Sequence, residues 1–396
     1  MTQRILMLLE NGVYPEDRRV VKEANALVHA GYEVSVACPR WRGQAWRQTI
    51  DGVRVYRFPT RFAEGSAGGL AFEYVWAMLC LSALAWLVWL RRGFDVIHLH
   101  NPPDILFLIA LPFKLLGKRV VFDQHDLVPE LAEAKFGSRA LKEVALRLEG
   151  LSCRVADAVI TANDFARTFL LERHRLRPEK VTLVGNGPSI QALGSLDLKP
   201  PKLKADRRIS LGYIGVLDAQ DGVDYLIEAM DCLRRGQPDV DFVCTVIGDG
   251  SELPSLRRQV EDLGLDGRVR FAGWLDWASA MRELSACDLC VDAAPLNAYH
   301  RHNEPVKVLE YMALGRPMVL SDLPGHRHVA GDTALYARPA DGQEFAARAL
   351  ELLDDRDRAR RLGAAARKRF EEHFSWEAMS GNLLKVYASL AQGARR

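Results

Sequence analysis

The chain has 396 residues, of which 48% are hydrophobic and 26% are charged. This composition is typical of a globular protein and excludes a disordered chain, and the length favours two or three domains. A formal net charge of +2 is too small to indicate a protein that binds nucleic acid. Seven cysteines, an odd number spread thinly, do not form a disulfide framework, so we expect the protein in the reducing cytoplasm.

Strand-like and helix-like segments alternate in the first half of the chain, which predicts a parallel α/β domain. A helix is expected over 17–31, and strands are expected over 4–10, 33–39, 94–100, 119–126 and 157–163. Ligands of open α/β sheets bind beyond the carboxyl ends of the strands. The polar residues at those ends are therefore site candidates: His98, His100, Asn101, His125, Asp126 and Asn163.

The segment from Leu70 to Gly93 is nearly long enough to span a bilayer and contains three tryptophans. Because it lies between two strands of one expected sheet, we expect a buried or interfacial helix, with a transmembrane span as the alternative. The preceding stretch, 40–61, mixes six arginines with Trp41 and Trp46. It is either a solvated loop and hairpin or a basic surface that rests on an anionic membrane.

A second α/β series follows a stretch near 188–207 that is rich in proline, glycine and lysine and is expected to be a linker. Its expected strands are 209–215, 241–250, 269–274, 289–295, 317–321 and 333–339, with helices between most of them and at the end of the chain. We therefore expect two Rossmann-like domains, over residues 1–190 and 205–374. A cleft between two such domains suits a nucleotide-linked substrate.

Residues 303–322 combine helix signals with charges of both signs. Pro305 is expected just inside the start of a helix, and Gly315 at its end can take a left-handed cap. The N-terminus of this helix is a ready anion site, and Lys307 lies in its first turn. Glu310 lies among apolar residues and needs a partner if it is buried.

Two strand–glycine–helix junctions contain Gly215, Gly248 and Gly250, which allow close backbone approach to a ligand. The spacing does not complete a dinucleotide fingerprint, so structural tight turns are an equal alternative. Cys287 and Cys290 form a lone CxxC pair, which we expect to pack in the core.

His98 and His100 are alternate residues of one expected strand, so their side chains share a face and could bind a metal. No third ligand is evident in the sequence, and we therefore expect no metal site. His326 and His328, which follow Leu-Pro-Gly, are expected on a surface loop.

Four segments, in the same order, resemble the family-4 glycosyltransferases of the GT-B fold. Enzymes of this family use nucleotide sugars and retain the anomeric configuration. The segments are 17–39, 100–131, 213–250 and 305–319. The second is similar to a bacterial subgroup that builds cell-surface polysaccharides, and the fourth is the most specific. The resemblance covers about residues 4–390 and implies two Rossmann-like domains facing across a cleft, with a last helix, 375–396, that packs back on the first domain.

The resemblance also implies roles for residues of the donor helix. Glu310 would accept hydrogen bonds from the ribose hydroxyls of the donor, and Lys307 would face the diphosphate. The backbone around Glu304 and Pro305 would hold the phosphate or the hexose. Gly215 and Gly248 would lie in the donor-binding loops.

In the first domain, the resemblance places Gly12 close to the diphosphate and His125 against the donor sugar near the reacting carbon. Asp126 would contact the acceptor or orient His125. The resemblance implies no cofactor and no catalytic metal. The expected partners are a nucleoside diphosphate sugar and a glycan or lipid-diphosphate-linked acceptor, at the inner face of the cell membrane.

The chain departs from the family pattern at the first glutamate of the motif. His302 stands at that place, eight positions before Glu310, and Glu304 lies six positions before it. Either His302 or Glu304 takes over the hexose contact, or the loop is shifted.

A second departure concerns the first loop of the donor domain, where the family commonly has two basic residues. Val216 and Asp221 stand there instead. Neutralisation of the phosphates must then depend on Lys307 and backbone amides, or on the loop residues His300, Arg301 and His302.

These observations predict a retaining enzyme that moves a hexose or N-acetylhexosamine-type sugar to a glycan or lipid-linked acceptor. We name no enzymic nucleophile. A sugar-nucleotide epimerase of the same fold is one alternative, although it leaves the apolar helix unexplained. A catalytically inactive scaffold subunit is another, favoured by the missing basic pair.

Overall fold

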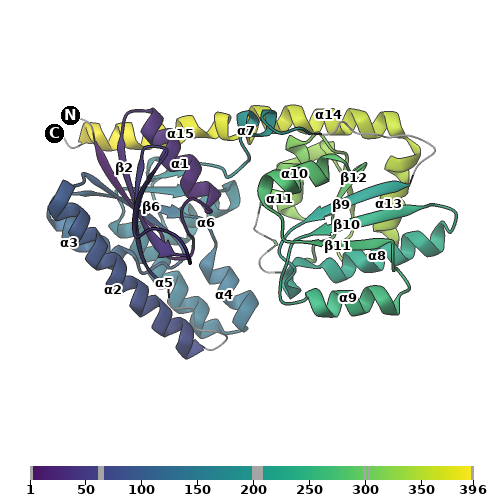
Figure 1. Cartoon of the computed structure of the whole chain (residues 1–396), viewed down its shortest axis with the longest axis horizontal. Coiled ribbons are helices and arrows are strands. Elements are labelled where there is room, and N and C mark those ends of the chain that lie inside the picture. The colour runs from purple at the N-terminus through teal and green to yellow at the C-terminus, as the bar shows by residue number, and fades with distance from the viewer. Residues whose placement is uncertain (1–2, 61–66, 199–207, 298–299, 302–303, 394–396) are drawn as a thin grey trace. The chain divides into compact units, whose positions relative to one another are not determined.

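The computed structural model describes residues 3–60, 67–198, 208–297, 300–301 and 304–393 (Figure 1). The chain divides into two compact units. Unit 1 comprises Met1–Gly185 and Met379–Arg396, and unit 2 comprises Asn186–Ala378. Each unit is a mainly parallel sheet with helices packed on it, so the predicted α/β class is confirmed.

The sheet of unit 1 has eight strands within the described residues, in the order β3-β4-β2-β1-β5-β6-β7-β8. The strands are β1 (Arg4–Leu8), β2 (Glu33–Arg40), β3 (Arg47–Ile50), β4 (Val53–Pro59), β5 (Val96–His100), β6 (Arg119–Gln124), β7 (Ala158–Thr161) and β8 (Val181–Leu183). All pair in parallel except β3 with β4. The strand order reverses between β1 and β5, which is where such sheets bind ligands.

The helices of unit 1 connect these strands and cover the sheet. They are α1 (Arg18–His29), α2 (Ala67–Arg92), α3 (Phe107–Leu115), α4 (Val128–Phe136), α5 (Arg139–Val155), α6 (Asp164–His174) and η1 (Pro178–Lys180). Helix α15 (Trp376–Gly393) belongs to this unit from Met379 onward. Its Tyr387 hydroxyl lies 2.7 Å from His98 Nδ1 and so ties the helix to β5.

In the described part of unit 2 the sheet has six parallel strands, in the order β11-β10-β9-β12-β13-β14. Counted along the unit, this is the Rossmann order 3-2-1-4-5-6. The strands are β9 (Ile209–Ile214), β10 (Phe242–Ile247), β11 (Val269–Gly273), β12 (Leu289–Asp292), β13 (Met318–Ser321) and β14 (Leu335–Ala337). The helices are α7 (Ile190–Gly194), η2 (Ala219–Asp221), α8 (Val223–Gly236), α9 (Leu253–Asp262), α10 (Trp277–Ser285), α11 (Val306–Ala313), α12 (Pro324–Ala330), η3 (Gly331–Thr333), α13 (Gly342–Asp354) and α14 (Arg356–His373).

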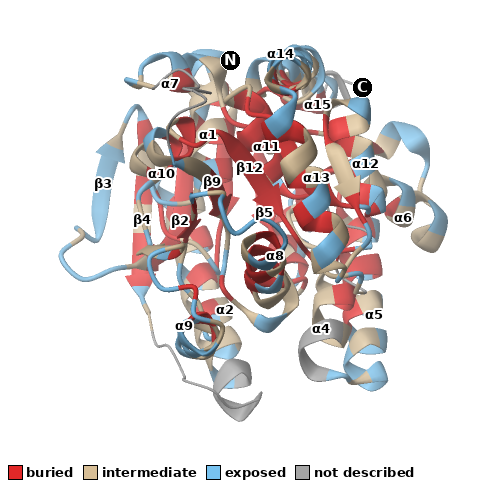
Figure 2. Cartoon of the chain, turned by 90° about the vertical axis from the view of Figure 1, so that its right-hand side faces the viewer, coloured by how far each residue is buried: buried red, intermediate tan, exposed pale blue. Residues whose placement is uncertain are grey.

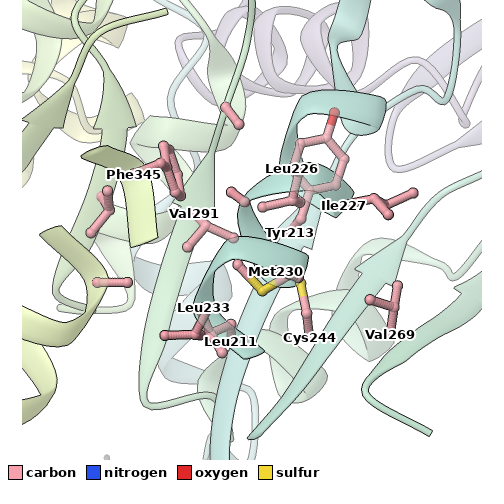
Figure 3. Packing of buried hydrophobic residues seen from close by; sticks show 14 of the residues in the cluster. Leu211, Tyr213, Leu226, Ile227, Met230, Leu233, Cys244, Val269, Val291 and Phe345 are labelled. Atoms are coloured by element: carbon pink, nitrogen blue, oxygen red, sulfur yellow. The ribbon is translucent and has the colours of Figure 1, made fainter. Parts of the chain in front are cut away.

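The core of unit 2 forms where α8 lies on the sheet (Figure 3). Leu226, Met230 and Leu233 recur at helical spacing and are buried against Leu211 of β9 and Val291 of β12. The central strands are buried, whereas the outer faces of the helices are exposed (Figure 2). This burial leaves the loops at the strand ends as the places where polar side chains gather.

The CxxC pair lies where the sequence predicted, because Cys287 follows α10 and Cys290 is on β12, and both are buried. Core packing of this pair is therefore confirmed.

Helix α2 has one buried and one exposed face. It is the one helix in the described part of the chain that is long and apolar enough to cross a membrane. Ala77, Leu81, Ala85 and Val88 are buried in the core of unit 1. The helix is thus part of the folded unit, while its other face carries exposed apolar side chains.

Candidate functional site

The site in unit 2 lies at the carboxyl ends of β9 and β12, the adjacent strands where the strand order reverses. Helix α11 begins nearby at Val306. Pro305 is the residue that precedes the helix, with φ −72° and ψ 122°, so the helix begins one residue later than predicted. The Nζ atom of Lys307, in the first turn, is 2.9 Å from the Tyr213 hydroxyl of β9, which places it at this strand end.

Lys307 is a largely enclosed cation, with its side chain 11% exposed, and is held by three groups. Besides Tyr213, its Nζ lies 3.6 Å from Asp292 Oδ1 and 3.9 Å from Asp221 Oδ1. Burial alone would lower the pKa of Lys307, but Asp292, Tyr213 and Asp221 outweigh it and raise the pKa above its ordinary value. Lys307 therefore stays charged at physiological pH, beside the N-terminus of α11, where an anion is favoured.

Gly215 and Gly248 have no room for a side chain. A Cβ on Gly215 would lie 2.6 Å from the Tyr213 hydroxyl and 3.1 Å from Lys307 Nζ. Gly248 has φ +142°, and its Cβ would lie 1.9 Å from the carbonyl oxygen of Gly215. A backbone bond from the Gly215 N–H to Ile247 O, 3.0 Å long, holds the two loops together. The two glycines thus allow the loops after β9 and β10 to pack tightly beside Lys307.

His326 lies in α12 and is 1% exposed, so the prediction of a surface loop is wrong for this residue. Pro324 opens a short helix, as is favourable at a first helical position, and turns His326 inward. His326 Nδ1 is 2.6 Å from Ser321 O, and its Nε2 is 3.2 Å from Asp292 Oδ2. Asp292 is fully buried; although burial would raise its pKa, Lys307 and His326 hold that pKa below its usual range.

His300 does not carry the positive charge that would be needed to neutralise the phosphates of the donor. Its Nε2 lies 2.9 Å from the carbonyl oxygen of Gln220, and burial together with Lys307 lowers the pKa of His300 to about 4. The ring is therefore neutral near pH 7. Arg301 is exposed, and His302 lies outside the described residues.

Glu310 is 6% exposed and receives a hydrogen bond of 3.1 Å from the indole nitrogen of Trp277 in α10. The buried glutamate thus has the partner that the sequence required. Glu310 lies one turn after Lys307 on the same helix, so the two side chains share a face. Glu304 lies before α11 and its carboxylate is 3.5 Å from His328 Nε2.

The end of α11 fixes the direction of the following strand. Gly315 has φ +63°, and its N–H donates to Met312 O at 2.9 Å, while the Arg316 N–H donates to Tyr311 O at 3.1 Å. This is a Schellman cap, and its positive φ explains the glycine that the sequence indicated.

In unit 1, His125 and Asp126 directly follow β6 and lie beside the end of β5. Asn101 holds this turn: its Oδ1 accepts the His125 N–H at 2.6 Å and the Asp126 N–H at 3.2 Å. Its Nδ2 donates to Asp104 Oδ1 at 2.9 Å, and burial raises the pKa of Asp104 to about 8. Burial also raises the pKa of Asp126. Asn101 was a site candidate from its place at a strand end, and in the structure its side chain positions the backbone of His125 and Asp126.

Asp123 was not identified from the sequence, although it lies at the centre of unit 1. Its Oδ2 is 3.0 Å from His125 Nε2, and Arg19 of α1 binds both carboxylate oxygens at 2.6 and 3.0 Å. Burial would raise the pKa of Asp123, but Arg19 and His125 hold it well below the usual range. An ionised Asp123 accepts from the Nε2–H of His125, so Nδ1 is the nitrogen that can interact with another group.

His98 and His100 stack with their ring centroids 4.2 Å apart, as expected for alternate residues of one strand. The sequence showed no third ligand, but in the structure α1 and β6 bring Glu23 and Asp123 to the two histidines. Donor atoms of these four buried residues lie within 4.8 Å of one another. Arg19, however, binds Asp123 and lies 3.2 Å from Glu23 Oε1. The Arg19 guanidinium thus neutralises Asp123, while burial and Asp123 raise the pKa of Glu23 well above its ordinary value. The guanidinium would also repel a metal ion.

Gly12 lies in the loop after β1. A Cβ there would lie 2.7 Å from Asp17 Oδ2, and Asp17 caps α1 by accepting the Val20 N–H at 3.1 Å. Gly12 is therefore needed for the close packing of this loop on the start of α1. In the same loop region Glu10 is buried, and burial and Glu73 raise its pKa to about 7.

Two family models match the chain. The model "Glycosyl transferase 4-like domain" matches residues 17–187, and "Glycosyl transferases group 1" matches residues 208–355. The first range falls almost wholly in unit 1 and the second in unit 2. Between them the two models cover most of the chain.

Relatives and solved structures agree with these matches. Alpha-D-kanosaminyltransferase of Streptomyces kanamyceticus is 27% identical over 64% of this chain and 65% of its own length. A GDP-mannose-dependent phosphatidylinositol monomannoside mannosyltransferase of Corynebacterium glutamicum is 28% identical over 52% of this chain and 58% of its own length. The chain thus spans less than two thirds of the length of these relatives.

Similarity to solved structures extends over the whole chain. Sucrose-phosphate synthase of Thermosynechococcus elongatus has a TM-score of 0.78 at 19% identity and covers 99% of this chain and 100% of its own. Anabaena HepE, solved in complex with UDP and glucose, has a TM-score of 0.69 at 20% identity and covers 98% and 100%. The solved structures show that the chain has the two-domain GT-B fold. The two family models, which together cover most of the chain, show that it belongs to the group 1 glycosyltransferases.

Proposed function

We propose that the protein moves a hexose or N-acetylhexosamine-type sugar from a nucleoside diphosphate to a glycan or lipid-linked acceptor in cell-surface polysaccharide synthesis, with retention of configuration. Family membership supports sugar transfer, and UDP in the structures of HepE supports a nucleotide-sugar donor. The proposal rests on Lys307, a largely enclosed cation at the switch point of a Rossmann sheet and at a helix N-terminus.

The donor would bind to unit 2 through its diphosphate and its ribose. Lys307 and the first amides of α11 would hold the diphosphate, and Glu310 would accept hydrogen bonds from the ribose hydroxyls. The backbone at Gly215 and Gly248 would approach the donor where no side chain intervenes. The backbone at Glu304 and Pro305 would contact the phosphate or the hexose.

Departure of the diphosphate separates charge in the transition state, and a fixed cation stabilises that charge more strongly there than in the bound substrate. Lys307 is held in place by Tyr213 and Asp292, so little reorganisation is needed as the bond breaks. We expect no cofactor or metal to take part, as the resemblance to the family implies.

Unit 1 would supply His125 and Asp126 to the reaction. His125 would touch the donor sugar through Nδ1, since Nε2 faces Asp123. Asp126 would contact the acceptor or help to orient His125. Asp123 acts through His125 and is a positioning residue, while Gly12 would allow the backbone after β1 to come close to the diphosphate.

The test is calorimetric titration of the wild-type chain with UDP, GDP, ADP and dTDP, followed by incubation with the matching sugar nucleotides. We expect one nucleoside diphosphate to bind in the micromolar range, and its sugar nucleotide to be stable until an acceptor is added. Isomerisation of the sugar nucleotide without an acceptor would identify an epimerase instead. Failure of every nucleotide to bind would favour the scaffold subunit.

A further inference from the structure

Helix α2 carries an exposed apolar stripe opposite its buried face. The stripe repeats at intervals of three and four residues and so follows one side of the helix. Its large members are between 37% and 72% exposed: Phe72, Val75, Leu79, Trp86 and Leu90. Exposed apolar residues scattered singly need no explanation, but a stripe that extends from Phe72 to Leu90 on one side of a helix indicates an interaction surface.

Helix α3 extends this surface. It packs against α2 (Figure 1). The rings of Trp86 in α2 and Phe113 in α3 are centred 4.7 Å apart. Its outer side carries Leu108, Leu111 and Leu115, again at helical spacing, and Leu115 is 88% exposed. We call the exposed residues of the two helices the apolar face: Phe72, Val75, Leu79, Trp86, Leu90, Leu108, Leu111, Leu115 and Leu116.

Positive charge adjoins one end of the apolar face. Arg91 and Arg92 follow Leu90 directly and, with Arg47 and Arg54, line a cavity of about 710 Å³. The other described lining residues are Gln48, Thr49, Val55 and Tyr56, so none of them is acidic. Arg54 pairs with Glu33 at 2.7 Å, and the charge of Arg92 also acts on this carboxylate and helps to lower its pKa. Four guanidinium groups beside an apolar stripe favour a partner that is both anionic and apolar.

We infer that the apolar face and the arginine cavity dock the protein onto an anionic lipid bilayer. Apolar side chains of α2 and α3 would enter the boundary of the acyl chains, and the arginines would bind lipid phosphates. Helix α2 would lie parallel to the bilayer surface and would not cross the bilayer. Ala77, Leu81 and Ala85 belong to the core of unit 1, and a helix that crossed the bilayer would have to leave that core.

This inference deepens the proposed function, since a lipid-linked acceptor lies at such a surface. Its test measures lipid binding alone and is therefore separable from sugar transfer. Wild-type protein is sedimented with vesicles of phosphatidylcholine and phosphatidylglycerol at a ratio of 70:30, and with vesicles of phosphatidylcholine alone. We expect binding to the anionic vesicles that is at least about tenfold stronger and that weakens in 1 M salt, where the Debye length falls to about 3 Å.

Two matched pairs of variants locate the surface. Replacing Arg91 and Arg92 together by serine should lower the partition coefficient about thirtyfold, since each arginine near an anionic surface contributes about fivefold. The same double change at Arg360 and Arg361, two adjacent exposed arginines of α14, should leave it unchanged. Leu79→Glu should lower it by about tenfold or more, because the carboxylate would enter the apolar boundary.

Gln237→Glu, which adds the same charge at an exposed position of unit 2, is the control for Leu79→Glu. All of these positions are exposed, so the variants should keep the circular dichroism spectrum and nucleotide affinity of the wild type. The inference is overturned if the wild type does not bind anionic vesicles, or if the Arg91/Arg92 variant binds them as well as the wild type does. It is also overturned if light scattering shows a dimer that Leu79→Glu dissociates, because a second copy would then cover the apolar face.

Discussion

Replacing Asp221 by asparagine tests whether Lys307 faces the diphosphate of the donor. The Asp221 carboxylate lies 3.9 Å from Lys307 Nζ, and its side chain is 13% exposed. Burial raises the pKa of Asp221 from 3.8 to about 6, while Lys307 opposes this rise. Asp221 is therefore mainly ionised at a pH of about 7.5, and its charge opposes that of a diphosphate bound to Lys307.

The size of this effect follows from the charges. Two unit charges about 8 Å apart repel by about 2 kcal/mol at an effective dielectric constant of about 20. Lys307 screens part of this repulsion, so we expect Asp221→Asn to tighten the binding of UDP-glucose about fivefold at a pH of about 7.5. Wild-type affinity should rise as the pH falls to about 5, where Asp221 gains a proton, and the variant should show no such rise. The phosphates of UDP-glucose do not titrate in this range.

The same change should alter stability. A rise in pKa from 3.8 to about 6 corresponds to about 3 kcal/mol of free energy. The unfolded chain releases the proton of Asp221 at lower pH than the folded chain, so this contribution to stability is complete below a pH of about 4 and is lost as the pH rises through about 6. Asp221→Asn should therefore raise the free energy of unfolding at a pH of about 7.5 by at most about 3 kcal/mol, and by much less at a pH of about 4. Urea denaturation at the two pH values measures this.

Calorimetry of UDP-glucose binding between a pH of about 5 and 7.5 is the assay for affinity, with Glu228→Gln as the control. Glu228 is an exposed residue of α8 in the same unit, and its neutralisation should change neither affinity nor its pH dependence. The reasoning is refuted if Asp221→Asn binds with wild-type affinity at every pH, or if wild-type affinity does not change with pH. If UDP-glucose does not bind at all, the sugar nucleotide that binds in the titration of nucleotides is used.

Three further variants test the remaining assignments. Glu310→Gln should weaken nucleoside diphosphate binding by about tenfold to a hundredfold in calorimetry, because hydrogen bonds to a charged group contribute about that much. The 2′-deoxy nucleotide should bind this variant as tightly as the ribonucleotide does, since the variant has lost the hydroxyl contact. Asp123→Asn should lower kcat about a hundredfold and change the pH profile of transfer, because the Nε2–H of His125 loses its ionised acceptor. Gly248→Ala should lower the free energy of unfolding by about 3 kcal/mol or more in urea denaturation, because its Cβ would meet the Gly215 carbonyl oxygen at 1.9 Å.

For each of these three variants, one result would show that the prediction is wrong. An unchanged affinity of Glu310→Gln would remove Glu310 from the ribose site. Asp123→Asn also leaves Arg19 buried without its partner, so folding is checked by circular dichroism; a folded variant with wild-type kcat and pH profile would show that Asp123 has only a structural role. A Gly248→Ala protein of wild-type stability would show that the loops after β9 and β10 are less tightly packed than described.

Local signals in the sequence predicted most of the elements that form the site. Pro305 and Gly315 predicted the two ends of α11, and residues 317–321 were expected as the strand after it. The helix N-terminus, with Lys307 in its first turn, indicated an anion site. These features depend on neighbours within a few residues, where dihedral preferences and hydrogen bonds are local. The first helical residue was wrong by one, because Pro305 suits either position.

The partners of these residues could not be predicted, since they come from distant parts of the chain. Tyr213 is 94 residues from Lys307, and Tyr387 is 289 residues from His98. His326 follows Leu-Pro-Gly, a turn-like sequence, and only packing on the sheet makes it a buried neighbour of Asp292. In these cases tertiary packing decides burial and charge, which local patterns do not encode.

Helix α2 shows a third kind of limit. The helix has apolar residues of its own on every side, so the spacing of apolar residues could not show which face packs on the unit and which is exposed. The sequence left a buried, an interfacial and a transmembrane helix open. The structure shows Leu81 in the core and Leu79 64% exposed, and this difference between neighbouring positions carries the inference about lipid.

A crystal structure of the protein with the nucleoside diphosphate that binds it most tightly would test the donor site most directly. We expect a phosphate oxygen within hydrogen-bonding distance of Lys307 Nζ, next to the first amides of α11, and the ribose hydroxyls on the Glu310 carboxylate. A nucleotide bound elsewhere, with Lys307 still enclosed by Tyr213, Asp292 and Asp221 and touching no phosphate, would contradict this expectation.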